Sequence, residues 1–313
     1  MHVVAVAHYG LPHNRGGSEL MLHELLVALV RRGHSATLVV TDVDDKPTTV
    51  DGVRVLHGRE YLDSLPGTYD LLVSHHKESP DALEMAHRDG RPSVLLVHSD
   101  LPYNRKLFEA SPSLVVYNTE WVRRHWTKQG VTSPSVVVHP PVYRADHETT
   151  RGDMVTLVNA IPAKGVATFE AVARRMPSTR FLLVGGGYLQ SQQRRVRLSN
   201  VVWQDHTDDM RRDVWSRTRI LLMPSSYESY GMVGVEAMHS GIPVIAHPTP
   251  GTREMLGRAG TFVSRTDTRR WQTAIRQLWN SRLASESARA RARELDPEPE
   301  LSAFADRAEG LCG

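Results

Sequence analysis

Short runs of apolar, mostly β-branched residues alternate with amphipathic helical patterns along this chain. In the first half the apolar runs lie at 3–9, 35–41, 53–58, 69–75, 93–98, 114–118 and 135–140. Between the first two runs, Leu22, Leu25 and Leu29 follow the spacing of one helix face. Strands that are apolar throughout and separated by helices predict a parallel sheet covered on both faces.

The same alternation restarts after an interruption. The stretch 140–153, PPVYRADHETTRGD, is rich in prolines and polar residues and is typical of a linker. Apolar runs then follow at 154–159, 179–185, 200–204, 219–224, 242–247 and 260–264. The tail, 267–313, has no strand-like run and shows helical patterns at 268–294 and 299–311. The pattern therefore predicts two tandem, doubly wound, Rossmann-like α/β domains, at 1–143 and 152–296, with ligands at the carboxyl ends of the strands.

Composition narrows the class of protein. The one cysteine, Cys312, excludes an intrachain disulfide and a cysteine-based metal site. The longest apolar run, ELLVALV, is far shorter than the roughly 18 residues of a membrane span, and MHVVAVAHYG does not resemble a signal peptide. We therefore expect a cytoplasmic protein.

Charge is unevenly distributed along the chain. Residues 151–313 hold 23 Lys and Arg against 17 Asp and Glu, whereas residues 1–150 hold 15 Lys and Arg against 18 Asp and Glu. The basic second half suits an anionic ligand or nucleic acid.

Two glycine-rich turns follow strands but lack a dinucleotide-binding fingerprint. In HNRGGSE, Gly16 and Gly17 allow the backbone to approach a ligand closely, and we expect Ser18 to cap the following helix. In VGGGYLQ, which includes Gly185 and Gly187, a glutamine stands where a third glycine is needed. Neither turn matches GxGxxG, so the pattern alone favours plain structural turns at both places over ligand-binding loops.

Charged and aromatic side chains supply further candidates. Lys164 stands where a helix is expected to begin, so it is either a surface lysine or an ammonium aimed at a diphosphate. His75 and His98 end two strands and are expected at the ligand-binding edge, but no HExxH or similar spacing indicates zinc. TDVDD, at 41–45, is interpreted as a solvated loop rather than a metal-binding DxD.

The stretch PSSYESYGMVGVEAMHSG, at 224–241, places two acids around a turn. Glu228 precedes Gly231, and Glu236 falls inside the helix that follows. The helix dipole stabilises acidic side chains near a helix N-terminus, so capping of the helix is one interpretation. The other is a site with a phosphate on the helix N-terminus and a sugar beside it.

Taken together, these motifs resemble glycosyltransferase family 4, the retaining enzymes of GT-B fold. ESYGMVGVEAMHSGIPVIA is similar to the E-x7-E signature of that family, and GGSE, YDLLVSH, LLVHSD and LVNAIPAKG match weaker family stretches in the same order. The resemblance spans nearly the whole chain. It implies a C-terminal helical segment, 297–313, that returns to the first domain.

The resemblance also implies a role for each candidate. Glu228, Lys164 and His98 would be catalytic, with Glu228 and His98 beside the transferred sugar. The implied donor-binding residues are Asn159, Gly185, Gly231, Met232, Val233, Glu236 and Gly17. In that set Glu236 would hold the ribose, and Asn159 stands where the family usually has an arginine. The implied acceptor-binding residues are Asn14, Ser18, Glu19 and His75.

The function implied is transfer of a hexose, with retention, from a nucleoside diphosphate sugar to an acceptor hydroxyl. UDP-glucose is the favoured type of donor, and no cofactor or metal is expected. A small-molecule acceptor is favoured, while the oligomeric state stays open. Three alternatives remain: a glycoside hydrolase using Glu228 and Glu236, a non-catalytic nucleotide-sugar-binding protein, and transfer to nucleic acid or lipid. For the lipid, the helix at 119–129 carries Trp121, but Trp121 and Val122 are expected to pack against the sheet.

Overall fold

The computed structural model describes residues 1–65, 67–186 and 190–313, and the chain divides into two compact units. The first unit comprises Met1–Pro141 with Pro297–Gly313, and the second comprises Val142–Asp296. Gly187, in the turn VGGGYLQ, lies outside the described residues. Within the described part of the chain, no helix is both long enough and apolar enough to span a membrane.

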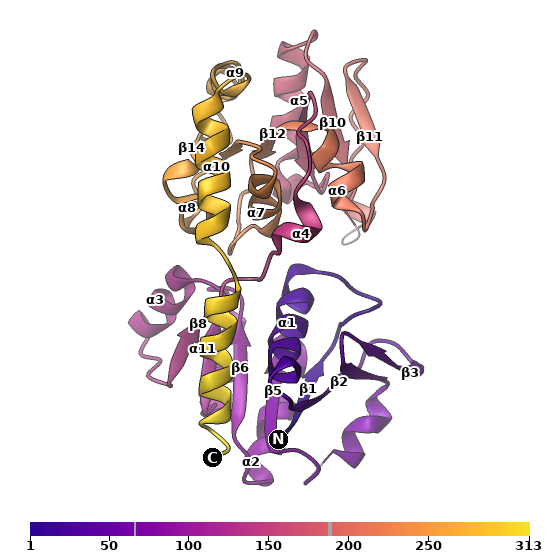
Figure 1. Cartoon of the computed structure of the whole chain (residues 1–313), viewed down its shortest axis with the longest axis vertical. Coiled ribbons are helices and arrows are strands. Elements are labelled where there is room, and N and C mark those ends of the chain that lie inside the picture. The colour runs from indigo at the N-terminus through magenta and orange to yellow at the C-terminus, as the bar shows by residue number, and fades with distance from the viewer. Residues whose placement is uncertain (66, 187–189) are drawn as a thin grey trace. The chain divides into compact units, whose positions relative to one another are not determined.

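The first unit is built on an eight-stranded sheet (Figure 1). Its strands are β1 (His2–Ala7), β2 (Ser35–Val40), β3 (Asp45–Val50), β4 (Val53–His57), β5 (Leu71–His75), β6 (Ser93–Val97), β7 (Leu114–Tyr117) and β8 (Ser135–Val137). The order is β3-β4-β2-β1-β5-β6-β7-β8. The central strands β1, β5 and β6 are buried almost throughout, as expected for a parallel sheet with helices on both faces.

The stretch TDVDD is a partly exposed loop at residues 41–44, as expected, and the edge strand β3 begins at its last residue, Asp45. β3 pairs antiparallel with β4, whereas the other strand pairs of the sheet are parallel. The sequence DKPTTV is polar and mostly exposed, so no apolar run marks it. Its strand conformation comes from hydrogen bonding to β4, which periodicity along the chain does not report.

The helices of the first unit are α1 (Gly17–Arg31), α2 (Ser79–Arg88), α3 (Glu120–Lys128) and α11 (Glu298–Glu309). Short 3₁₀ segments occupy Arg59–Ser64, His76–Glu78 and Pro102–Ala110. The C-terminal helix α11 packs against α1, and the two lie side by side in Figure 1. Its buried face includes Leu301 and Phe304, and Arg32 at the end of α1 donates to Asp306 over 2.6 Å.

The second unit contains a six-stranded, all-parallel sheet of order β11-β10-β9-β12-β13-β14. Its strands are β9 (Met154–Val158), β10 (Phe181–Val184), β11 (Val201–Gln204), β12 (Thr218–Met223), β13 (Val244–Ala246) and β14 (Thr261–Phe262). The helices are α4 (Arg144–His147), α5 (Val166–Arg175), α6 (Met210–Asp213), α7 (Met232–His239), α8 (Pro250–Leu256), α9 (Thr268–Leu278) and α10 (Arg282–Glu294). Further 3₁₀ segments are Pro162–Lys164, Gln190–Gln192, Trp215–Arg217 and Gly257–Ala259.

Alternate residues of the central strands feed two hydrophobic clusters. On β12, Leu221 and Met223 belong to one cluster, which contains residues of α7, while Ile220 and Leu222 belong to the other, which contains residues of α5 and α9. Both faces of the strand are therefore covered. This explains why the sequence of β12 is apolar without alternation.

Two local predictions for this unit need correction. The helical pattern at 268–294 is two helices, because Ser281 accepts a hydrogen bond from the backbone N–H of Ala284 and caps α10. The predicted linker contains the short helix α4, which packs against α7.

Candidate functional site

An ion pair joins two predicted catalytic residues of the second unit. The Lys164 Nζ lies 2.6 Å from Oε1 of Glu228, and the hydroxyl of Ser225 donates to the same oxygen over 2.7 Å. The Glu228 side chain is 9% exposed, whereas that of Lys164 is 32% exposed. A ligand can therefore reach the ammonium, and an anionic ligand would compete with the carboxylate for it.

Close backbone packing holds the segments of Lys164 and Glu228 together. Lys164 ends a 3₁₀ turn, and α5 begins two residues later, at Val166. The N–H of Ser226 donates to the carbonyl of Ala163 over 2.9 Å. Gly165, at φ 87°, lies so near Pro224 that a Cβ would be 2.6 Å from the proline carbonyl oxygen. The turn that carries Lys164 and the loop before Glu228 are thus packed directly against each other.

The N-terminus of α7 follows Glu228 by a few residues. Gly231 is its N-cap residue, at φ 104°, and no side chain caps this end. The first backbone N–H groups of a helix have no partner within the helix, so Met232 and Val233 are placed to donate to an anion. A carboxylate and an open helix N-terminus therefore belong to one loop-and-helix segment, and a cation from the turn before α5 contacts that carboxylate.

Glu236 lies in the interior of α7 and differs from an ordinary surface carboxylate. Burial raises the pKa of Glu236 to about 7. Its Oε2 has no hydrogen-bond partner among the described residues and lies 3.8 Å from Nδ1 of His147, which is also unpartnered there. Burial lowers the pKa of His147 to about 4, so this ring is neutral at pH 7. A buried acceptor without a donor costs free energy, which a bound hydroxyl would relieve.

Asn159 and Gly185 also lie at strand ends of the second unit. Asn159 adopts φ 67° just after β9, and its Oδ1 accepts a hydrogen bond from Gln193 over 3.0 Å. The N–H of Gly185 donates to the carbonyl of Gln204 over 2.8 Å. This N–H is therefore already hydrogen-bonded and is not available to a ligand. What Gly185 can provide is room for a ligand to approach the backbone closely, because it has no side chain.

In the first unit, the predicted acceptor residues surround the start of α1. Asn14 Oδ1 accepts from the N–H of Gly16, which is the N-cap residue, and Gly17 is the first residue of α1. The expectation that Ser18 caps the helix is wrong, because Ser18 is already inside it and donates to Oε2 of Glu19 over 2.9 Å. Burial raises the pKa of Glu19.

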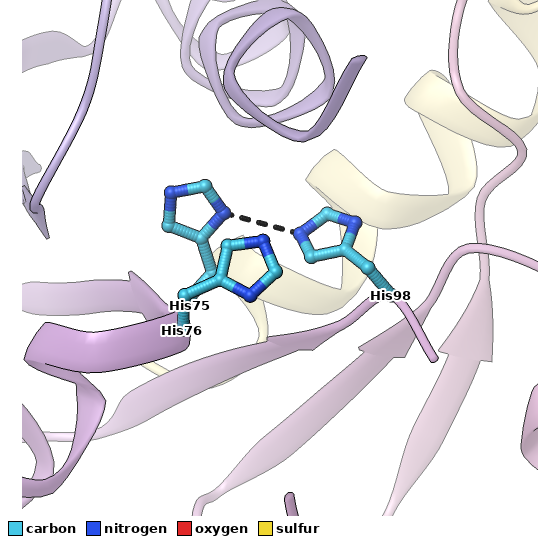
Figure 2. A group of neighbouring side chains, drawn as sticks. All are labelled: His75, His76 and His98. Atoms are coloured by element: carbon cyan, nitrogen blue, oxygen red, sulfur yellow. Dashed lines mark hydrogen bonds between the residues drawn. The ribbon is translucent and has the colours of Figure 1, made fainter. Parts of the chain in front are cut away.

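His75 and His98 meet at the carboxyl ends of β5 and β6, with a third histidine beside them (Figure 2). His75 Nδ1 lies 3.1 Å from Nε2 of His98. The ring of His76 stacks on that of His98, with 4.8 Å between centroids. Burial lowers the pKa of His75 and His98 well below the ordinary value and that of His76 to about 4. All three rings are therefore neutral at pH 7.

The structure thus brings together Lys164 and Glu228 in the second unit and His75 and His98 in the first. Sequence reasoning missed Ser225, which donates to Glu228; His147, which lies beside Glu236; and His76, which stacks on His98. His76 had a readable signal, since it directly follows a histidine that ends a strand. No motif indicated Ser225 or His147. The fold of the loop before α7 brings Ser225 to Glu228, and the packing of α4 against α7 brings His147 to Glu236.

The aromatic residues of α3 pack inward. Val122 and Trp126 are buried, and Trp121 packs against the same hydrophobic cluster of the first unit. The exposed Arg124 is paired with Glu120. The expected packing of Trp121 and Val122 is confirmed, so this helix presents no apolar face to a lipid surface.

Comparison with known proteins agrees with this arrangement. Residues 155–281 match the sequence model of the family described as Glycosyl transferases group 1. The chain is 27% identical over 265 residues to the D-inositol 3-phosphate glycosyltransferase of Mycobacterium tuberculosis, which covers 68% of this chain and 54% of that protein. The chain therefore spans about half the length of this curated relative.

Solved structures share the fold across nearly the whole chain. Anabaena HepE in complex with UDP-glucose has a TM-score of 0.80 at 18% identity, covering 99% of this chain and all of that one. Sucrose-phosphate synthase from Thermosynechococcus elongatus has a TM-score of 0.78 at 17% identity, covering 99% and 98%. These likenesses confirm the predicted GT-B fold, with its two parallel-sheet α/β domains.

Proposed function

We propose that this chain, whose residues 155–281 match the sequence model of the Glycosyl transferases group 1 family, transfers a hexose from a nucleoside diphosphate sugar to an acceptor hydroxyl. Retention at the anomeric carbon is part of the proposal, as is a reaction that uses no metal. UDP-glucose is the favoured donor, a choice supported by the UDP-glucose bound to HepE.

The observation that carries the proposal is the contact of Lys164 with Glu228, a carboxylate on the segment that leads into the bare N-terminus of α7. A diphosphate placed at this N-terminus would meet backbone N–H groups and the favourable end of the helix dipole. It would also draw the Lys164 ammonium away from Glu228. Donor binding would then leave the Glu228 carboxylate facing the sugar.

Lys164 and the N-terminus of α7 act on the leaving group. The bond between the anomeric carbon and the diphosphate oxygen breaks, and negative charge develops on that oxygen. Positioned donors and cations stabilise such charge most strongly in the transition state. Asn159 stands where the family usually has an arginine, so one cationic phosphate contact is lost and Lys164 and the helix N-terminus carry more of the charge stabilisation.

Glu228 and the acceptor complete the reaction on the same face of the sugar. The transition state is oxocarbenium-like, and the Glu228 carboxylate stabilises its positive charge and orients the sugar. The acceptor oxygen bonds to the anomeric carbon, and its proton passes to the departing phosphate oxygen. No covalent intermediate with the protein forms.

The remaining candidates bind the two substrates. Glu236 accepts from the ribose hydroxyls, which supplies the donors its unpartnered oxygen lacks. We assign donor binding to residues 152–296 and acceptor binding to residues 1–143, with Asn14, Ser18, Glu19 and His75 on the acceptor. His98 faces the transferred sugar. A small-molecule acceptor is favoured over a lipid, since α3 lacks an exposed apolar face.

A thermal-shift panel of UDP-, GDP- and ADP-glucose tests donor binding. A donor at 100 times its Kd stabilises the protein by roughly 2.7 kcal/mol, and we expect this with the UDP-sugar. Release of UDP in the presence of mixed hydroxyl acceptors then tests transfer. Absence of a shift with every nucleotide sugar contradicts the proposal, and binding without UDP release on any acceptor identifies a non-catalytic binding protein.

A further inference from the structure

Three histidine side chains gather at the carboxyl ends of β5 and β6, as Figure 2 shows. His75, His76 and His98 each offer a ring nitrogen, and these nitrogens all lie within 4.8 Å of one another. Four zinc ligands at about 2.0–2.1 Å from the ion stand about 3.4 Å apart. The 3.1 Å between His75 and His98 already matches that spacing, and His76 needs only a modest shift.

The chemistry of the three rings suits a metal rather than an anion. The imidazole nitrogen is a common metal ligand, and each of the three rings offers one to the cluster. Between His75 and His98, one ring nitrogen carries the shared proton. A metal displaces this proton to the far nitrogen of the same ring, so binding requires a change of tautomer and no net loss of a proton.

We propose that His75, His76 and His98 form a site for a divalent transition metal, with Zn²⁺ as the ion that fits best. Three imidazoles suit Zn²⁺, Cu²⁺ and Ni²⁺, whereas Mg²⁺ and Ca²⁺ prefer oxygen ligands. Three protein ligands leave the fourth position of a tetrahedral ion for water or another small ligand. His75 and His76 are adjacent, but His98 follows His75 by 23 positions, so no familiar ligand spacing in the sequence indicates the site.

The site has a consequence for the proposed transfer reaction. A bound metal occupies a ring nitrogen of His98 and fixes the orientation of that ring. If His98 faces the transferred sugar, the metal inhibits transfer rather than supporting it. This consequence rests on the proposed function, whereas metal binding itself does not.

Metal binding is tested on the full chain after chelator treatment. Titration with Co²⁺, followed by its visible absorption, and with Zn²⁺, followed by calorimetry, should each give one metal per chain. His76→Asn removes one ligand while retaining a residue that tolerates the left-handed conformation of position 76, at φ 56°. Its Kd for Zn²⁺ should rise by at least roughly 10-fold. The exposed His87 supplies the control, and His87→Asn should bind metal like the wild type.

The possible results distinguish the metal site itself from the inhibition of sugar transfer by a bound metal. Equal Zn²⁺ affinity in the wild type and His76→Asn overturns the metal site, as does the absence of binding to the wild type. Inhibition by one equivalent of Zn²⁺ in the wild type, with His76→Asn still active, supports the inhibitory role. Tight Zn²⁺ binding without loss of transfer overturns that role alone. A metal-free chain that transfers no sugar contradicts the proposed function and leaves the metal result standing.

Discussion

At the scale of single residues, the ion pair between Lys164 and Glu228 has the clearest consequence. The carboxylate is nearly buried and accepts hydrogen bonds from Lys164 and Ser225. Glu228→Gln keeps the shape and removes the charge. We expect kcat to fall on the order of 100-fold, because the negative charge is needed only as the sugar becomes positive. Donor affinity should change by less than about threefold, as Lys164 remains to meet the diphosphate.

Steady-state kinetics and donor titration check this split between turnover and binding. Glu170 provides a matched control, since it is also a carboxylate of the second unit paired with basic side chains, Arg174 and Arg194. Glu170→Gln should leave kcat unchanged. A Glu228→Gln protein with wild-type kcat would contradict the role given to Glu228.

The buried carboxyl of Glu236 predicts a pH dependence of stability. Its folded pKa of about 7 lies above the ordinary 4.5, so the folded state holds the proton more tightly than the unfolded state. The wild type therefore loses unfolding free energy as pH rises from about 4.5 through 7, by about 3 kcal/mol in total. Glu236→Gln lacks this dependence.

Denaturant unfolding of the ligand-free wild type and Glu236→Gln at pH 5 and pH 8 measures the effect. The advantage of the variant should grow between the two pH values, since other titrating groups are shared and cancel. An equal difference at both pH values would show that Glu236 ionises normally. UDP binding should narrow the gap at pH 8 if the ribose hydroxyls donate to the carboxylate.

At the scale of elements, the N-terminus of α7 depends on Gly231. An alanine there would be strained at φ 104°, and its Cβ would lie 2.8 Å from Cε of Met223. We expect Gly231→Ala to displace the first turn of α7 and to weaken UDP binding by at least roughly 10-fold, since the turn supplies several N–H donors. Gly130→Ala is the control. It places an alanine at a similarly strained φ of 89°, but no neighbouring atom lies within 4 Å of its Cβ.

The change in melting temperature on adding UDP measures donor binding in both variants. Gly130→Ala loses some stability through strain alone but should keep the full UDP-induced shift. Should Gly231→Ala keep that shift as well, the phosphates would have to bind elsewhere.

The elements that the sequence predicts well are those whose pattern reflects local burial. β12 is apolar along its length because both of its faces are covered, and α1 shows helical spacing because one face is buried. β3 escapes prediction because its exposed, polar sequence is a strand only through pairing with β4. The break between α9 and α10 depends on one capping serine, Ser281.

The candidate residues also divide into those that a local motif reveals and those that only the fold brings together. Glu228, Gly231 and Glu236 are near in sequence, so a motif can reveal them. The contact between Lys164 and Glu228 spans 64 positions, and that between His75 and His98 spans 23. Such contacts depend on which strands are neighbours in the sheet. Strand order is a property of the whole fold, so these pairs can be placed from sequence only through a resemblance.

At the scale of the whole molecule, each unit has its own hydrophobic clusters. Those around β1 and β7 contain residues of the first unit, and those around β10 and β12 contain residues of the second. The first unit is completed by a helix from the far end of the chain, because α11 packs on α1. Ion pairs such as Arg32–Asp306 join these helices, but their exposure to solvent weakens the attraction within each pair.

The apolar face of α11 should therefore carry most of this stabilisation. Phe304 is fully buried, and Phe304→Ala should destabilise the first unit by about 3–5 kcal/mol. Hydrogen exchange should speed up within residues 1–141 and stay near the wild-type rate within 142–296, since the second unit keeps its own core. Leu283→Ala, at a side chain that is 73% exposed, is the control and should change neither. Equal loss of protection in both units would mean that they unfold as one cooperative body rather than as two.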